Sequence, residues 1–243
     1  MAIIIFKAIE KCNSNCIYCD VIKKHQNEIM SYDLLEIVFK RLNEYLEKYP
    51  GETIDLTWHG GEACLLGVEY FRKALEFQER HCGNTKDRIK HLIQSNMTVL
   101  TQELIDVFKQ LGIDRIGSSF EPLPNIRGIG KNRDSEKYNE LFFRGANLAE
   151  ENGLRWGAIY VVHRRSLPYA KRILYTMTNL NATSPPAFNM IYCFVADENS
   201  IGITPEEYAD FLGEILHLYW ENPDRFGHIK PIATIIDVIQ GKG

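Results

Sequence analysis

Short apolar, β-prone runs alternate with longer helical segments along the whole chain. We expect the runs to form strands at 3–8, 53–58, 89–95, 114–119, 156–162 and 188–194. The longer segments predict helices at 31–49, 68–82, 101–111, 135–152, 166–180 and 204–221. Strands that alternate with helices indicate a parallel sheet with helical crossovers.

Six strand–helix units are fewer than the eight that close a full barrel. The pattern therefore predicts an α/β fold of the open (βα)6 barrel type, with right-handed crossovers. Barrels of this kind place their chemistry in the loops after the strands. A chain of 243 residues, 45% of them hydrophobic, suits one domain that spans 1–243.

Composition and charge narrow the choice of partners and compartment. The net charge is −4 and no basic tract is present, so we expect no nucleic-acid binding. No membrane-spanning stretch is visible. The apolar start at 2–6 is too short for a signal peptide and lacks a basic region before it, which predicts a cytoplasmic protein.

Three of the six cysteines, Cys12, Cys16 and Cys19, fall within eight positions directly after the first predicted strand. Thiolates of this kind hold iron–sulfur clusters, and a four-iron cluster needs one ligand for each iron. Three cysteines would leave one iron open, and an open position is typical of a reactive metal site.

The cysteine spacing also permits two different kinds of site. The first is a zinc site completed by His25, although the spacing matches the common zinc motifs poorly. The second is a non-catalytic iron–sulfur or zinc module that transfers electrons or binds a partner. Of the single cysteines, Cys82 and Cys193 are expected to be buried apolar residues, whereas Cys64 lies close enough to Glu62 to line the site.

The C-x3-C-x2-C loop, with Tyr18 before its last cysteine, resembles the cluster loop of the radical S-adenosylmethionine (SAM) superfamily. The resemblance implies that Cys12, Cys16 and Cys19 bind a [4Fe–4S] cluster and that its open iron binds SAM. It also implies that Tyr18 contributes to cofactor binding.

Later motifs extend this resemblance and imply further SAM ligands. Gly60-Gly61-Glu62 resembles the GGEP motif, whose backbone and acid bind the SAM amino group, although Ala63 replaces the proline. Ser119 takes the place of a serine that binds the SAM carboxylate or ribose. Arg127 has the spacing of the family's SAM-binding arginine, and a guanidinium suits a carboxylate.

The chain is most similar to the SPASM-type branch of maturases that act on peptides and proteins. His59 and the segment with Gln94 and Asn96 are expected to line the substrate site, and no catalytic base is identified. The resemblance implies a maturase that crosslinks ribosomal peptides (RiPPs) through thioether or carbon–carbon bonds. The alternative is an anaerobic sulfatase-maturating enzyme, which makes formylglycine.

The resemblance also implies partners and a further domain. A radical SAM enzyme needs an electron donor such as flavodoxin or ferredoxin, and its substrate here would be a peptide or protein. The segment 229–237 resembles the connection to the C-terminal SPASM domain, which carries auxiliary clusters. No cysteine follows Cys193, so we expect this domain to be missing from the chain.

Overall fold

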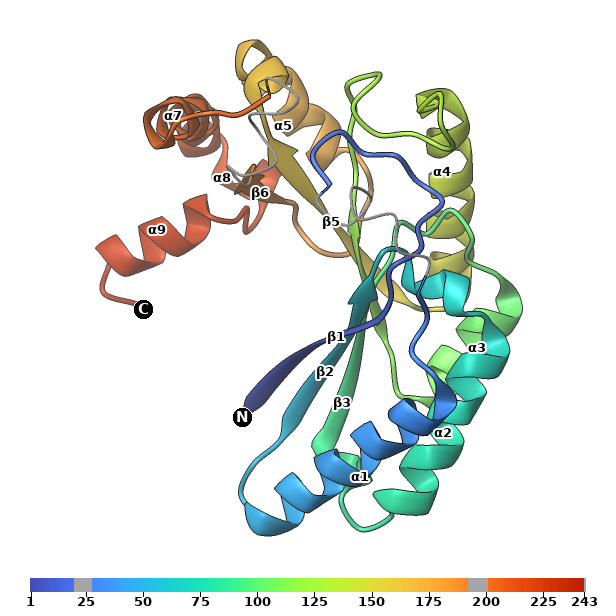
Figure 1. Ribbon diagram of the computed structural model, residues 1–243. Coiled ribbons are helices and arrows are strands. Elements are labelled where there is room, and N and C mark those ends of the chain that lie inside the picture. The colour runs from blue at the N-terminus through green and yellow to red at the C-terminus, as the bar shows by residue number, and fades with distance from the viewer. Residues whose placement is uncertain (20–27, 192–200, 243) are drawn as a thin grey trace. The chain divides into compact units, whose positions relative to one another are not determined.

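The computed structural model describes residues 1–19, 28–191 and 201–242, and the strands lie close to their predicted positions (Figure 1). They form one sheet in sequence order. Neighbouring strands from the first to the fourth, and the last two strands, pair in parallel as predicted. The strands are β1 (Ala2–Ile9), β2 (Ile54–Gly60), β3 (Ile89–Gln94), β4 (Arg115–Ser119), β5 (Arg155–Val162) and β6 (Ala187–Met190).

The helices also follow the predicted order. They are α1 (Tyr32–Lys48), α2 (Val68–His81), α3 (Gln102–Gln110), α4 (Ser135–Glu151), α5 (Ala170–Thr178), α7 (Pro205–Glu221), α8 (Pro223–Phe226) and α9 (Ile232–Ile239), with short 3-10 turns η2 (Ala63–Leu66), η3 (Lys86–Arg88) and η4 (Arg164–Tyr169). Among the residues described, none of these helices has the length and apolar character that a membrane span requires.

The observed elements differ from the predicted ones at the start of one helix and near the C-terminus. The helix expected at 166–180 becomes α-helical only at Ala170. Pro168 lies in the 3-10 turn η4 before it, and a proline disfavours the α-helical conformation of the residue that precedes it. The helices α8 and α9 were not predicted. Positions 192–194, expected in the sixth strand, lie outside the described residues.

The chain divides into two compact units, which are described separately. The first comprises 1–13, 21–117 and 139–154, and the second comprises 14–20, 118–138 and 155–243. The first unit therefore holds β1 to β3 with the helices between and after them, and the second holds β5, β6 and the C-terminal helices.

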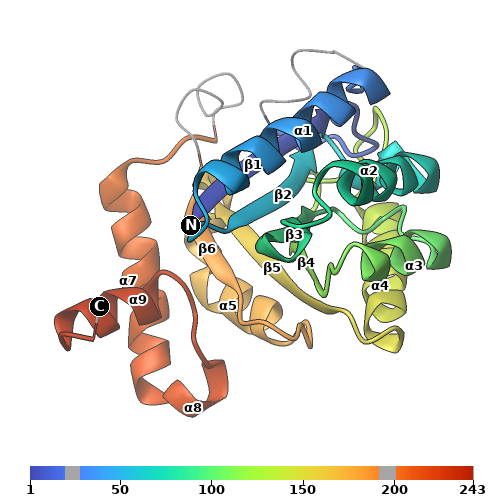
Figure 2. The same ribbon diagram turned by 90° about the horizontal axis from the view of Figure 1, so that it is seen from below.

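In the first unit, α1, α2 and α3 lie along one face of β1, β2 and β3 (Figures 1 and 2). Trp58 lies at the centre of this core with none of its surface exposed. Its ring packs edge-on against Phe6 and Phe71, with centroids 4.9 Å and 5.0 Å away. Burial of such large aromatic surfaces is the main force that fixes the helices to the sheet.

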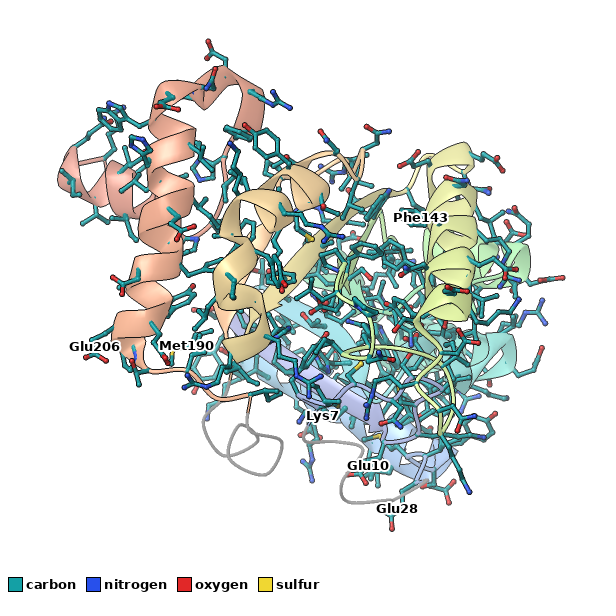
Figure 3. All side chains as sticks on the ribbon, turned by 90° about the horizontal axis from the view of Figure 1, so that it is seen from above. Lys7, Glu10, Glu28, Phe143, Met190 and Glu206 are labelled. Atoms are coloured by element: carbon teal, nitrogen blue, oxygen red, sulfur yellow. The ribbon has the colours of Figure 1, made fainter. Side chains whose placement is uncertain are left out.

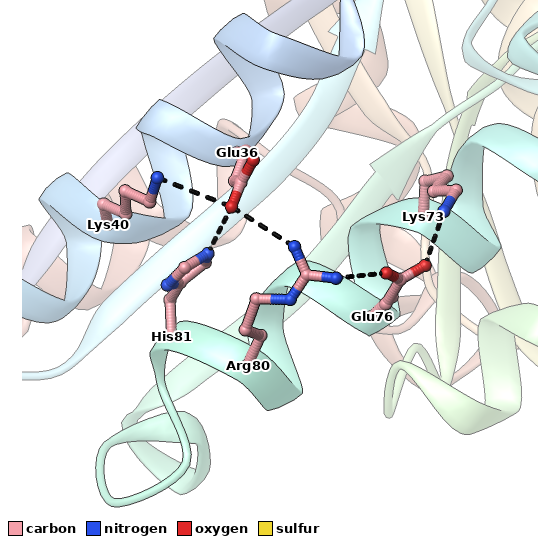
Figure 4. Close-up of polar contacts among 6 residues, drawn as sticks. All are labelled: Glu36, Lys40, Lys73, Glu76, Arg80 and His81. Atoms are coloured by element: carbon pink, nitrogen blue, oxygen red, sulfur yellow. Dashed lines mark hydrogen bonds and ion pairs between the residues drawn. The ribbon is translucent and has the colours of Figure 1, made fainter.

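A polar network joins α1 and α2 at the surface of the first unit (Figure 4). Glu36 on α1 accepts from His81 at 2.7 Å and pairs with Arg80 at 3.3 Å, both on α2. The hydrogen bond from His81, followed by the charge of Lys40, lowers the pKa of Glu36. The Arg80 and Lys40 side chains are half-exposed, so their pairs with Glu36 orient the two helices more than they stabilise them.

In the second unit, α7 begins at a capping box and is fixed to its neighbours by polar contacts. Thr204 accepts from the Glu207 N–H at 3.2 Å, and Glu207 accepts from the Thr204 N–H at 2.8 Å. Arg164 in η4 donates to both oxygens of Glu207, at 2.8 Å and 3.1 Å. The Tyr208 hydroxyl donates to the Phe188 carbonyl at 2.6 Å, which links α7 to β6.

Candidate functional site: loops at the carboxyl ends of the strands

The loops that follow β1, β2 and β3 are joined to one another within the first unit. The N–H of Gly61 donates to the carbonyl of Ile9 at 2.8 Å, and the N–H of Glu62 donates to the carbonyl of Lys11 at 2.9 Å. The turn after β2 is thereby bound to the backbone that leads into the cysteine loop.

The two glycines of this turn are required by that close approach. A Cβ atom at Gly60 would lie 1.9 Å from the Ile9 carbonyl oxygen, and one at Gly61 would lie 2.3 Å from the Lys11 oxygen. The sequence predicts that the glycines let the backbone approach a ligand. The described chain shows that they let it approach the β1 loop, so the motif also builds the cysteine loop.

The Glu62 carboxylate lies in the interior of this region, only 1% exposed. Its Oε1 accepts from the Ser95 hydroxyl at 2.7 Å and from the Cys64 N–H at 2.9 Å, and its Oε2 accepts from the Asn96 N–H at 2.6 Å. Burial raises the pKa of Glu62, while these three hydrogen bonds act in the opposite direction. The predicted SAM ligand is thus also the link between the loops after β2 and β3.

Asparagine and threonine side chains connect the β3 loop to the cysteine loop. Asn96 donates through Nδ2 to Asn13 Oδ1 at 2.9 Å, and the same nitrogen lies 4.0 Å from the Cys12 sulfur. Asn13 in turn donates to the Thr98 hydroxyl at 2.8 Å, and that hydroxyl donates to Asn96 Oδ1 at 2.7 Å. We call Lys11, Asn13, Glu62, Cys64, Ser95, Asn96 and Thr98 the three-loop network.

This network changes what we expect of Asn96, which the sequence placed at the substrate. The residue is 4% exposed, and its amide is engaged with Asn13 and Thr98. Its amide nitrogen lies 4.0 Å from the Cys12 sulfur, and an N–H group that donates to a cysteine sulfur is one means of tuning the reduction potential of an iron–sulfur cluster.

The rest of the cysteine loop belongs to the second unit. The N–H of Asn15 donates to Gly128 at 2.8 Å, and the N–H of Ile17 donates to Ile126 at 3.0 Å, so the loop lies antiparallel to the segment that follows β4. Arg133 fixes the loop further, because its Nε donates to the Asn15 carbonyl at 2.7 Å.

Arg127 lies beneath this loop, 9% exposed. Its guanidinium packs on the Tyr138 ring, 4.9 Å from the centroid, and donates to the Tyr18 hydroxyl at 3.3 Å. No hydrogen-bond partner among the described residues meets its buried Nε. In the described part of the chain no carboxylate pairs with this guanidinium, and a buried guanidinium with an unmet donor fits an anionic ligand, which agrees with the predicted binding of the SAM carboxylate.

The three cysteines of the loop carry thiols and are half-buried. Burial raises the pKa of Cys16, and the Arg127 charge acts against it. In the described parts of the chain, no three His, Cys, Asp or Glu side chains are grouped closely enough to hold a metal ion. Cys12 belongs to the first unit and the other two to the second. Cysteine thiolates are the donors that an iron–sulfur cluster needs.

The predicted burial is confirmed for Cys82, and Cys64, which was expected near Glu62, is buried as well. Cys64 is 3% exposed and Cys82 is fully buried, and burial raises the pKa of both thiols. Cys193, and the His25 of the zinc alternative, lie outside the described residues.

The remaining predicted residues lie at or beside strand ends. His59 is in β2, Gln94 ends β3 and Ser119 ends β4, and all three are partly exposed. The Ser119 carbonyl accepts from the Tyr138 hydroxyl at 3.2 Å. Each therefore lies in the region where this class of fold places ligands.

One buried pair near this region was missed from the sequence. His163 after β5 lies 3.2 Å through Nε2 from Glu121 Oε2, and the other Glu121 oxygen accepts from the Leu123 N–H at 2.8 Å. Both side chains are buried. The two positions are far apart in sequence and form no motif, so only the fold brings them together.

A match to a family model decides the family. The model of the radical SAM superfamily matches residues 7–172, which is more than half of the chain. The chain belongs to the radical SAM superfamily. Members of this superfamily are enzymes characterised by a [4Fe–4S] cluster and SAM, and this confirms the cofactors that the sequence predicts.

Radical SAM relatives of this chain include sulfatase-maturating enzymes. The chain is 30% identical over 166 residues to a serine-type anaerobic sulfatase-maturating enzyme from Bacteroides thetaiotaomicron, which covers 65% of this chain and 38% of the relative. It is 27% identical over 231 residues to a cysteine-type enzyme of this kind from Clostridium perfringens, with 91% and 61% covered. The chain thus spans less than two thirds of the length of either relative.

Solved structures of radical SAM enzymes share its fold. An anSMEcpe structure with bound AdoMet matches 100% of the chain and 67% of its own, with a TM-score of 0.78 and 19% identity. A second, with AdoMet and the Cp18Cys peptide, matches 99% and 61%, with a TM-score of 0.72 and 19% identity. These similarities confirm the predicted α/β fold class.

Proposed function

We propose that this chain is the radical SAM domain of a peptide or protein maturase. The observation that carries the proposal is the similarity of the chain to sulfatase-maturating enzymes over most of its length. When bound, the cluster and SAM supply a 5′-deoxyadenosyl radical that removes a hydrogen atom from the substrate. The task of the protein is to bind and orient both partners.

Within this proposal the predicted residues take separate roles. Cys12, Cys16 and Cys19 hold the cluster, and Tyr18 lies among them. Arg127 binds the SAM carboxylate, because its buried Nε has no partner among the described residues. Ser119 binds the carboxylate or ribose at the end of β4.

The Gly60-Gly61-Glu62 turn receives the SAM ammonium. Glu62 supplies the negative charge. Its Oε2 accepts from the Asn96 N–H, and a carboxylate oxygen has a second lone pair that can accept a bond from the ammonium. In this proposal the substrate binds next to His59 and Gln94.

Oxidation of a serine or cysteine to formylglycine is the reaction that the relatives favour, because the Bacteroides and Clostridium enzymes are both named for sulfatase maturation. A crosslinking maturase, which the sequence favours, is the second candidate. An electron donor of the flavodoxin or ferredoxin type would reduce the cluster in either case.

The proposed function is tested by anaerobic reconstitution followed by dithionite, SAM and synthetic peptides that contain serine or cysteine. We expect 5′-deoxyadenosine to form and to disappear in Cys16→Ala, while Cys82→Ala keeps it. An aldehyde on the peptide supports formylglycine formation, and a crosslink supports the second candidate. A protein that binds zinc alone and leaves SAM intact would contradict the proposal.

A further inference from the structure

Cys16 lies directly opposite Arg127 in a short antiparallel pairing within the second unit. Opposite residues of such a pairing point to the same face, and they come closest where their neighbours, not they themselves, make the backbone hydrogen bonds. Cys16 and Arg127 form a pair of this kind. The register is given by three flanking pairs, which are Ser14 with Ile129, Asn15 with Gly128, and Ile17 with Ile126.

The backbone around Arg127 is held from its other side as well. The Arg127 carbonyl accepts from the Ser135 hydroxyl at 2.6 Å. Ile129 exchanges two hydrogen bonds with Asp134, each of 3.0 Å. All these residues belong to the second unit, so the place of Arg127 opposite the cysteine is fixed by contacts within that unit.

The guanidinium of Arg127 stays inside, close to the cysteine loop. It donates at 3.3 Å to the hydroxyl of Tyr18, two residues after Cys16, and packs on the Tyr138 ring. Charged side chains usually remain in water, as that of Glu206 on α7 does in Figure 3, whereas Arg127 is only 9% exposed. A charge in such an interior is weakly screened and acts strongly on its neighbours.

The charge of Arg127 acts on the Cys16 sulfur. Burial raises the pKa of the Cys16 thiol, and the Arg127 charge, which lowers it, is the strongest of the charges that act on this group. Arg133 acts in the same direction and Glu121 in the opposite one, and both act less. The Glu121 carboxylate lies 3.2 Å from His163. Arg127 is thus the leading positive charge at this sulfur.

We propose that the buried charge of Arg127 raises the reduction potential of the cluster that Cys16 helps to bind. Reduction adds one negative charge to the cluster, and a positive charge opposite a ligand cysteine stabilises that state. The inference rests on the proposed function for the role of Cys16 as a cluster ligand. It adds a second task to Arg127, which that function assigns to the SAM carboxylate.

The test measures the midpoint potential of the reconstituted cluster in the protein without SAM, by redox titration followed by electron paramagnetic resonance. We expect Arg127→Met to lower the equilibrium constant for one-electron reduction about tenfold, which is about 59 mV for such a couple. Arg127→Gln, which keeps an N–H group for Tyr18, is a second uncharged variant and should show the same fall.

Arg127→Lys separates the two tasks of the arginine. It retains the positive charge and should keep most of the potential, whereas it should bind SAM more weakly because an ammonium lacks the fork of a guanidinium. A fall in potential as large as that of Arg127→Met would overturn the inference.

Lys131→Met is the matched control, because it removes an exposed positive charge four residues farther along the same segment. Water and salt screen exposed charges, so its potential should stay close to that of the unmodified protein. An unchanged potential in the two uncharged Arg127 variants would overturn the inference and leave the proposed function standing. Loss of the cluster from both would assign Arg127 to cluster binding and overturn it too. A cluster that survives in Cys16→Ala would instead refute the role of Cys16 in the proposed function.

Discussion

His91 is a neutral residue held inside the first unit by two hydrogen bonds. Its Nδ1 accepts from Trp58 Nε1 at 3.0 Å, so the proton lies on Nε2, which is 2.8 Å from Gln78 Oε1. Burial lowers the pKa of His91 from 6.5 to about 4. The native state therefore resists a protonation that the unfolded chain accepts.

This difference predicts a loss of stability in mild acid. Above pH 6.5 the ring is neutral in both states and no stability is lost, and the loss grows as the pH falls toward 4. Between pH 7 and pH 5 it amounts to about 2 kcal/mol of unfolding free energy. Urea denaturation of the protein and of His91→Gln at both pH values measures it. An equal pH dependence of the two proteins would contradict the prediction.

At the same scale, several residues were predictable from the sequence and others were not. Cys82 is buried as expected. The pairing of His163 with Glu121, and the place of Lys7 beside His59, depend on strand register and on residues far apart in the chain. No local motif carries that information, because side chains on different strands meet only when the sheet forms.

At the scale of elements, the predicted bounds of the strands and major helices lie within a few residues of the observed ones. The signals for these bounds are local: the spacing of apolar residues, the helix caps, and the glycines at which helices end. Thr204 caps α7 as its sequence predicts. α9 was missed because its run, Ile232–Ile239, is apolar on nearly all sides and carries no capping side chain. Such a run lacks the regular recurrence of apolar and polar positions from which an amphipathic helix is predicted.

The turn after β2 gives a prediction of its own. In Gly61→Ala the new Cβ would collide with the Lys11 carbonyl, so the cysteine loop must move. We expect the reconstituted variant to retain much less iron, with a far-ultraviolet circular dichroism spectrum close to that of the unmodified protein. Iron per chain, measured after anaerobic desalting, provides the readout.

Gly83→Ala is the control for that variant. A Cβ at Gly83 meets only the Glu79 carbonyl, at an ordinary contact distance of 3.6 Å, so iron retention should not change. Full iron content in both variants would show that the close approach of the two loops does not shape the cluster site.

For the whole molecule, binding of SAM should couple to folding. A ligand that binds only the native state stabilises it by about 2.7 kcal/mol at a hundred times its Kd. We therefore expect SAM to raise the Tm of the anaerobically reconstituted protein. Arg127→Met should abolish most of this rise, because it removes the buried guanidinium, whereas the exposed Arg41→Met should not. A rise of equal size in both variants would exclude Arg127 from the SAM site.

The three-loop network has a consequence for how the site can evolve and move. Because Glu62 and Asn96 each bond to more than one loop, an insertion in any of these loops would break contacts made by the other two. A change in the sequence of one loop would then need matching changes in the other two. In native-state hydrogen exchange, the amides of Glu62 and Asn96 should open together in one cooperative event rather than loop by loop.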